Sequence, residues 1–137
     1  MAVRVNLEIL LPKSNSRVKA VGLLNTGFEG ETAEVLIPLK FAERLKLWPK
    51  LPQNVEVRNF ETPAGLTRMY YLEDIAEASV EGKASVKCSL IISEAEHEVL
   101  LNDAVIEELK IVIEEPKKGL WRFRDEERMR QSLPPQY

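Results

Sequence analysis

The sequence is poor in the features that mark several large classes of protein. It contains one cysteine, Cys88, so no disulfide can form within the chain, and a lone thiol favours a reducing compartment. No apolar run reaches the roughly 18 residues that a membrane-spanning helix needs. The start, Met-Ala-Val-Arg-Val-Asn-Leu-Glu, alternates in polarity and lacks the apolar block of a signal peptide. These absences predict a cytoplasmic protein with no membrane partner.

A strong excess of charge of one sign is missing as well. The 19 Lys and Arg residues nearly balance the 22 Asp and Glu residues, and the net charge of -3 does not favour nucleic acid as a partner. The single histidine, His97, lies between two glutamates in an expected turn. One imidazole with scattered carboxylates is too small a set for a metal site, so we expect no metal.

What the chain does have is the composition of one globular domain. Hydrophobic residues make up 45% and charged residues 30% of its 137 residues, which suffices for one core and not for two. Polarity alternates with a period of two along much of the chain, beginning with Val3, Val5, Leu7 and Ile9, and this period predicts strands. There is no internal repeat and no low-complexity segment.

The same pattern predicts a mainly β chain with two short helices. Strands are expected over residues 3–9, 18–24, 35–37, 55–61, 66–72, 75–80, 84–92, 99–101, 111–113 and 120–123. Pro38 suits the first position of one helix, and Asn102 or Asp103 can cap another that ends near Leu109. A polar turn follows the first strand, and residues 62–65 read as a hairpin tip. Residues 125–137 form a tail that is charged at first and then contains two prolines.

One stretch combines an apolar strand with an unusual turn. Residues 21–28 read Val-Gly-Leu-Leu-Asn-Thr-Gly-Phe, and the apolar run Val-Leu-Ile-Pro follows at residues 35–38. This order resembles the active-site loop of retropepsin-like aspartic proteases, in which the tripeptide is Asp-Thr-Gly. In that family the aspartate projects its carboxylate to a two-fold axis and the threonine hydroxyl joins the two loops. The glycine permits a turn that a side chain would obstruct. Asn25, Thr26 and Gly27 occupy these positions here.

The order of further segments extends the resemblance over roughly residues 3–123. The hairpin with Pro63, Ala64 and Gly65 at its tip falls where the family has its flap, the lid that closes over a bound peptide. Residues 99–105, Val-Leu-Leu-Asn-Asp-Ala-Val, resemble the second signature, in which a strand leads into the C-terminal helix. The ending Gly-Leu-Trp-Arg-Phe at residues 119–123 is similar to that of small stand-alone microbial members.

The resemblance implies a fold and an activity. Residues 1–124 would form an all-β, closed-barrel-like retropepsin domain, and residues 125–137 its tail. Because one chain carries one half-site, the active form would be a symmetric homodimer. It would be an aspartic endopeptidase acting on a peptide or unfolded protein, without a cofactor. Asn25, Thr26 and Gly27 would form the catalytic loop, and Phe28 and residues 63–65 would border the substrate.

Asn25 departs from the family pattern at the catalytic position. An amide has no useful basicity, and loss of general acid–base help alone costs about 10²–10⁴-fold in rate. Since a homodimer carries the change twice, we expect essentially no turnover. Whether Asn25 is engineered or natural stays open. The alternative function is a non-catalytic peptide-binding or scaffolding dimer that holds an extended peptide by main-chain hydrogen bonds. A third reading is a β-rich oligomeric module without a groove.

Other chemically suggestive residues have ordinary structural explanations. An aspartate that opens a helix, such as Asp103, is usually a cap. Cys88 alternates with apolar neighbours and is expected in the core, and Trp48 and Trp121 are expected to be packing residues and not stacking platforms. The arginines from Arg122 to Arg130 interleave with acidic residues, which is typical of a solvated face or a subunit contact.

Overall fold

The computed structural model describes residues 2–136 and is mostly β, with 50% strand and 9% helix. The strands are β1 (Arg4–Leu11), β2 (Ser16–Leu24), β3 (Glu34–Pro38), β4 (Glu56–Thr62), β5 (Gly65–Val80), β6 (Val86–Ser93), β7 (Val99–Leu101), β8 (Ile111–Glu115), β9 (Leu120–Phe123) and β10 (Arg130–Gln131). The helices are α1 (Leu39–Arg44) and α2 (Asp103–Glu108). The predicted all-β class with two short helices is confirmed.

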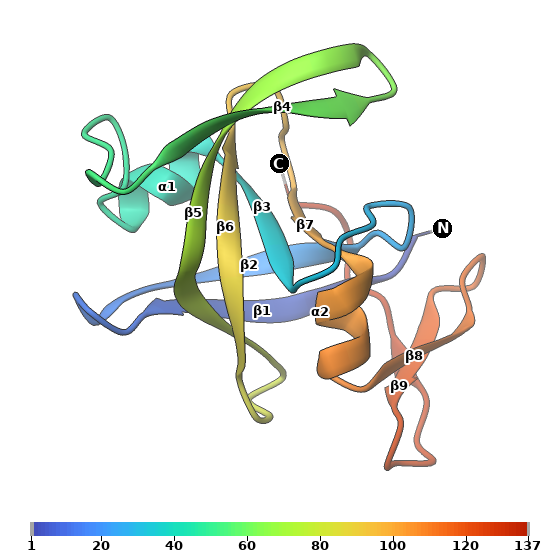
Figure 1. The fold of residues 1–137 in the computed structure, drawn as a ribbon. Coiled ribbons are helices and arrows are strands. Elements are labelled where there is room, and N and C mark those ends of the chain that lie inside the picture. Colours follow the sequence, from blue (N-terminus) through green and yellow to red (C-terminus); the bar gives the residue numbers. More distant parts are fainter. Residues whose placement is uncertain (1, 137) are drawn as a thin grey trace.

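Six strands close into a barrel (Figure 1). Their order is β1-β2-β7-β3-β6-β5, and the ring closes where residues 7–10 of β1 pair with residues 77–80 of β5. Strand β4 stands outside the ring and pairs only with the first half of β5 among the described strands. The hairpin of β4 and β5 therefore projects from one end of the barrel.

The barrel core follows from the alternation in the sequence. Val3, Val5, Leu7 and Ile9 are nearly or fully buried, and the intervening side chains of β1 face outward. The β1–β2 hairpin turns at Asn15, whose φ of 58° lies in the left-handed region that asparagine tolerates better than most residues. Strand β6 departs from the expected alternation, because both of its faces are buried from residue 88 onward. One face lines the core and the other is covered from outside the barrel.

A single long strand replaces the two strands expected over residues 66–72 and 75–80. Strand β5 runs unbroken through both, with a shift of register between Leu72 and Ala76. Asp74 has a φ of 47°, and its N–H donates to Oγ of Ser89 at 2.9 Å. The polar pair Glu73–Asp74 is thus a bulge and not a break, which lets one strand serve both the hairpin and the barrel.

Both helices begin close to the expected positions. Pro38 is the residue before α1 and not its first residue, so the helix begins one position later than predicted. Asn102 caps α2, since its Oδ1 accepts from the N–H of Val105 at 3.0 Å. No helix in the described part of the chain is long and apolar enough to cross a membrane.

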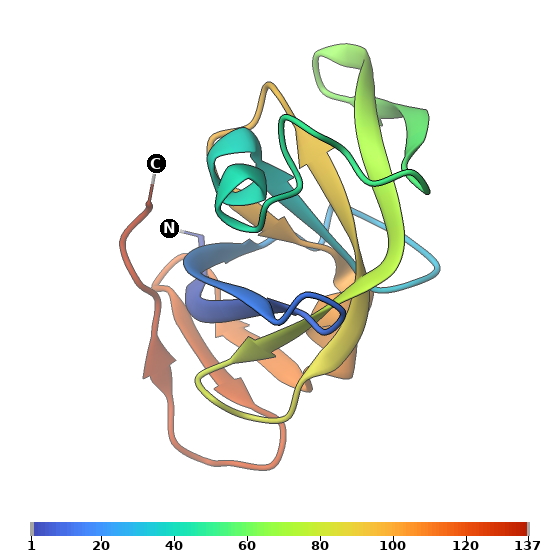
Figure 2. The same ribbon diagram turned by 90° about the vertical axis from the view of Figure 1, so that its left-hand side faces the viewer.

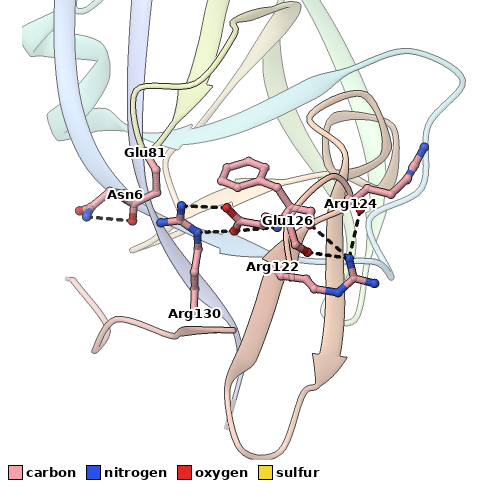
Figure 3. Close-up of polar contacts among 7 residues, drawn as sticks. Asn6, Glu81, Arg122, Arg124, Glu126 and Arg130 are labelled. Carbon is pink, nitrogen blue, oxygen red and sulfur yellow. Dashed lines mark hydrogen bonds and ion pairs between the residues drawn. The ribbon is translucent and has the colours of Figure 1, made fainter. Parts of the chain in front are cut away.

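A small three-stranded sheet of β8, β9 and β10 packs beside the barrel (Figure 2). Arg122 organises the turn that follows β9, because its Nη1 donates to the carbonyl oxygens of Phe123, Arg124 and Glu126 (Figure 3). Its Nε pairs with Glu114 at 2.7 Å. Arg130 pairs with Glu126 at 2.6 Å. Three of the alternating charges of this region, Arg122, Glu126 and Arg130, are therefore paired within the chain.

The tail beyond β9 returns to the start of the chain. Ser132 accepts the N–H of Arg4 on its Oγ at 2.8 Å, and the N–H of Leu133 donates to the Arg4 carbonyl at 2.9 Å. Oε1 of Gln136 accepts the N–H of Val21 at 2.9 Å. These contacts fasten the tail to β1 and β2 over the part of residues 125–137 that the structure describes.

Candidate functional site

The Asn-Thr-Gly turn lies at a crossing point of the strands. Strand β7 lies between β2 and β3, parallel to β2 and antiparallel to β3. Residues 25–33 connect β2 to β3, so the chain leaves on one side of β7 and comes back on the other. We call this connection, together with Glu34 at the start of β3, the floor loop (residues 25–34).

Backbone hydrogen bonds hold the start of the floor loop against the end of β7. The N–H of Asn25 donates to the carbonyl of Leu101, and the N–H of Asp103 donates to the carbonyl of Phe28, both at 3.0 Å. Within the turn, the N–H of Phe28 donates to the Asn25 carbonyl at 3.1 Å. Oδ1 of Asn25 accepts the N–H of Gly27 at 3.1 Å. The amide of Asn25 therefore points back into the turn that it begins.

Asn102 anchors the rest of the loop from a fully buried position. Its Oδ1 accepts from the N–H of Glu34 at 3.1 Å as well as from α2, and its Nδ2 donates to the carbonyl of Thr32 at 2.9 Å. Asp103 adds a further contact, since its Oδ1 accepts the N–H of Gly30 at 3.0 Å. The sequence predicted only a helix cap here. That Asn102 also ties the loop depends on strand order, which local pattern does not reveal.

Gly30 has a steric reason to lack a side chain. A Cβ built there would lie 2.7 Å from Nδ2 of Asn102 and 2.8 Å from Oε1 of Glu34. Gly27 is less confined, with Oδ1 of Asn25 at 3.3 Å from the same hypothetical atom. The sequence reading singled out Gly27 and missed Gly30, although Gly30 is the more closely packed of the two.

An apolar cluster lies on the outside of the barrel, next to the floor loop. We call it the apolar face; it comprises buried Leu36, Met69, Tyr71 and Ile91 with partly buried Phe28, Phe60 and Leu100. Its members come from β3, β4, β5, β6, β7 and the floor loop, and the barrel core is a separate cluster. Phe28, predicted to border the substrate, thus meets Phe60 of the β4–β5 hairpin in one cluster. Sequence alone did not reveal the other members, because they lie on strands far apart in the chain.

The hairpin tip is exposed and held by one hydroxyl. Oγ1 of Thr62 donates to the carbonyl of Gly65 at 2.8 Å and accepts the N–H of Ala64 at 3.2 Å. Gly65 has a φ of 105°, which favours glycine. Pro63, Ala64 and Gly65 are all exposed, and so are Thr26 and Gly27, while Asn25 is half-buried. The hairpin and the floor loop project on the same side of the barrel, the hairpin above the loop (Figure 1).

Burial changes the titration of two groups. It raises the pKa of Cys88 to about 12, so this core thiol is not a nucleophile. Burial also raises the pKa of Glu34 in the floor loop; Asp103 adds to this effect and Arg58 opposes it. Among residues 2–136 there is no group of three or more His, Cys, Asp or Glu side chains that could hold a metal ion.

Two hollows on the surface lie away from the floor loop and the hairpin tip. One of about 670 Å³ is bordered by β1, β2, the turn after β5 and Gln136, and its lining mixes polar and charged side chains with Leu7, Ala20 and Val21. Another of about 500 Å³ lies over the charged side chains of residues 122–127. Neither includes a residue of the floor loop or of the hairpin tip.

No protein-family model matches the chain, and no curated protein matches it. The resemblance to retropepsin-like proteases therefore stays a prediction. It depends on the floor loop, the β4–β5 hairpin and the segment from β7 into α2.

Proposed function

We propose that this protein is one subunit of a retropepsin-like homodimer with the architecture of an aspartic endopeptidase, in which Asn25 stands at the catalytic aspartate position. The observation that carries the proposal is the geometry of the Asn25 turn. It is a short turn at the end of β2, tied to Leu101 by the bond from the Asn25 N–H and capped internally by the Asn25 side chain. A residue so placed has a fixed backbone and a side chain near the surface.

A second copy of the chain would complete the site. One chain supplies one such turn, and an aspartic protease needs two carboxylates in proton-sharing distance. The exposure of Thr26 and Gly27 supports an axis at this point, because both are free to meet the same turn of a partner. A contact of this kind is isologous, with the same residues on both sides.

The apolar face and the hairpin would hold the substrate. An extended peptide satisfies its backbone along the free edge of a strand, and its apolar side chains gain from burial on Phe28, Phe60 and their neighbours. The exposed tip at residues 63–65 would close over it. Peptide or unfolded protein is therefore the substrate class that this surface suits.

The chemistry needs an aspartate at residue 25. With aspartate in both copies, one ionised carboxylate takes a proton from the attacking water and the other, protonated, polarises the scissile carbonyl. The Asn25 amide keeps the hydrogen bond to Gly27 and can do neither. That intact turn also favours a second candidate function, a non-catalytic peptide-binding dimer, because the loop is complete without a carboxylate.

The experiment compares the present chain with Asn25→Asp on an unfolded protein and on a peptide library. Asn54→Asp serves as a control, since it adds the same charge at an exposed position outside the site. We expect cleavage only by Asn25→Asp, and a dimer in light scattering for all three. Cleavage by the Asn25 form at the same rate would remove residue 25 from the catalytic role. Dimers that bind peptide while neither form cleaves would favour the binding function.

A further inference from the structure

One carboxylate beside the apolar face has no bonding partner. Glu34 is the first residue of β3, where side chains alternate: Val35 and Ile37 enter the barrel core, and Glu34 and Leu36 share the outer side. The paired register repeats this on β6, where Ser89 stands opposite Glu34 and Ile91 opposite Leu36. Among the residues that the structure describes, the Glu34 carboxylate makes no hydrogen bond or ion pair.

The backbone that carries this carboxylate is fixed on both sides. The N–H of Glu34 donates to Oδ1 of Asn102, and its carbonyl accepts the N–H of Asn102 at 3.2 Å. The missing side chain of Gly30 leaves room for the carboxylate, which a Cβ there would approach to 2.8 Å. The backbone that carries the Glu34 carboxylate is thus ordered before a ligand binds. Binding to this charge therefore costs less conformational entropy than binding to a charge on a flexible segment.

The charged side chains nearest to Glu34, those of Arg58 and Asp103, already have other partners. The guanidinium of Arg58, which lies on the same side of β4 as Phe60, pairs with Glu56 at 2.7 Å and lies 3.7 Å from the centre of the Tyr71 ring. Oδ1 of Asp103 accepts hydrogen bonds from the N–H groups of Gly30 and Ala104. Arg58 therefore attracts Glu34 without neutralising it, and the charge of Glu34 stays unmatched.

An unmatched, half-buried carboxylate favours a cation from outside. Burial weakens its hydration, so an incoming ammonium or guanidinium group gains more there than at an open surface. The stack of Arg58 on Tyr71 is a precedent within this region for a guanidinium held on an aromatic ring beside a carboxylate.

We infer that Glu34 makes the peptide site select a Lys or Arg side chain, beside the apolar residue that covers Leu36. This rests on the proposed function, since it names the peptides that the same site prefers. The competing role for Glu34 is a latch, in which Arg58 moves from Glu56 to Glu34 when the hairpin closes. A latch would act on every peptide equally, whereas selection acts only on basic ones.

The present chain suits a binding measurement, because its Asn25 should not cut the probe. We would measure fluorescence anisotropy with fluorescein-labelled octapeptides that carry a central Leu-Leu pair flanked by Lys, by Gln or by Glu. The native chain should bind the Lys set roughly five- to tenfold more tightly than the Gln set and reject the Glu set. Glu34→Gln should lose that preference and keep its affinity for the Gln set. Glu31→Gln, an exposed position in the same loop, should keep the preference.

Each other outcome contradicts the inference in its own way. A Lys preference that survives Glu34→Gln, or equal binding of all sets by the native chain, removes Glu34 as the selecting residue while leaving the peptide site in place. An equal loss of affinity for all sets in Glu34→Gln identifies a latch. If no set binds to a correctly folded dimer, the peptide-binding function fails and the inference fails with it.

Discussion

The floor loop and the β4–β5 hairpin form opposite sides of the candidate site and are held in opposite ways. The floor loop is tied by a fully buried amide, by Asp103 and by backbone bonds to the end of β7. The hairpin has one unpaired strand edge within the described structure, and its tip depends on the hydroxyl of Thr62. A site that must position a reacting group and also admit a chain-like ligand needs this combination of a fixed side and a movable side.

The largest expected effect comes from cutting the buried anchor of the floor loop. Asn102→Ala removes the partners of two N–H groups and one carbonyl, so it should lower the free energy of unfolding by about 3 kcal/mol. Thr62→Ala removes the equivalent anchor of the hairpin. It should lower the free energy of unfolding by only about 0.5–1 kcal/mol, because the exposed groups that Thr62 binds can form hydrogen bonds with water instead. Urea unfolding at one fixed protein concentration measures both. Equal losses would contradict the difference between the two sides.

A second test compares their motions directly. Amide hydrogen exchange of Ala64 and Gly65 should be faster than that of Val35 and Ile37 by roughly a hundredfold or more, since a hairpin that acts as a lid would open without unfolding the barrel. The amide of Glu34, bonded to Asn102, should resemble the barrel strands. Protection of the hairpin tip equal to that of β3 would exclude its role as a lid.

The smallest expected effect concerns the pH dependence of stability. Burial raises the pKa of Glu34 above its ordinary 4.5, so the native state binds this proton more tightly than the unfolded state does. The protonated form therefore favours folding at low pH, and that contribution is lost as the pH rises through the raised pKa. Glu34→Gln should raise the melting temperature slightly at neutral pH, with no gain below pH 4.5. A gain that is constant with pH would contradict burial as the cause.

Much of the fold could be predicted from local pattern. Alternating polarity identified β1 and β2, a short apolar run identified β3, and the turn residues at 62–65 marked the β4–β5 hairpin. The capping signal at Asn102 and Asp103 predicted α2. These features depend on neighbours within a few residues, which is the range over which sequence pattern is informative.

Features that depend on distant pairing could not be predicted. The pairing of residues 7–10 with 77–80 closes the barrel. The local sequence of either segment does not indicate which strand it pairs with. The insertion of β7 between β2 and β3 creates the anchor at Asn102, and it also brings Leu36 and Leu100 together on the apolar face. The continuity of β5 was missed because the polar pair Glu73–Asp74 interrupts the apolar pattern, and the bulge that carries the strand through it depends on pairing with β6. Assembly and activity remain predictions.

One measurement tests most directly the claim that two copies of residue 25 make one site. Asn25→Asp at fixed concentration would be unfolded together with increasing amounts of the Asn25 chain, refolded, and assayed for cleavage of an unfolded protein. If each active site needs an aspartate from both subunits, random pairing should reduce the rate to about one half at equal amounts and about one quarter at threefold excess. A rate that stays constant as Asn25 chain is added, or no cleavage by Asn25→Asp at any ratio, would contradict the account.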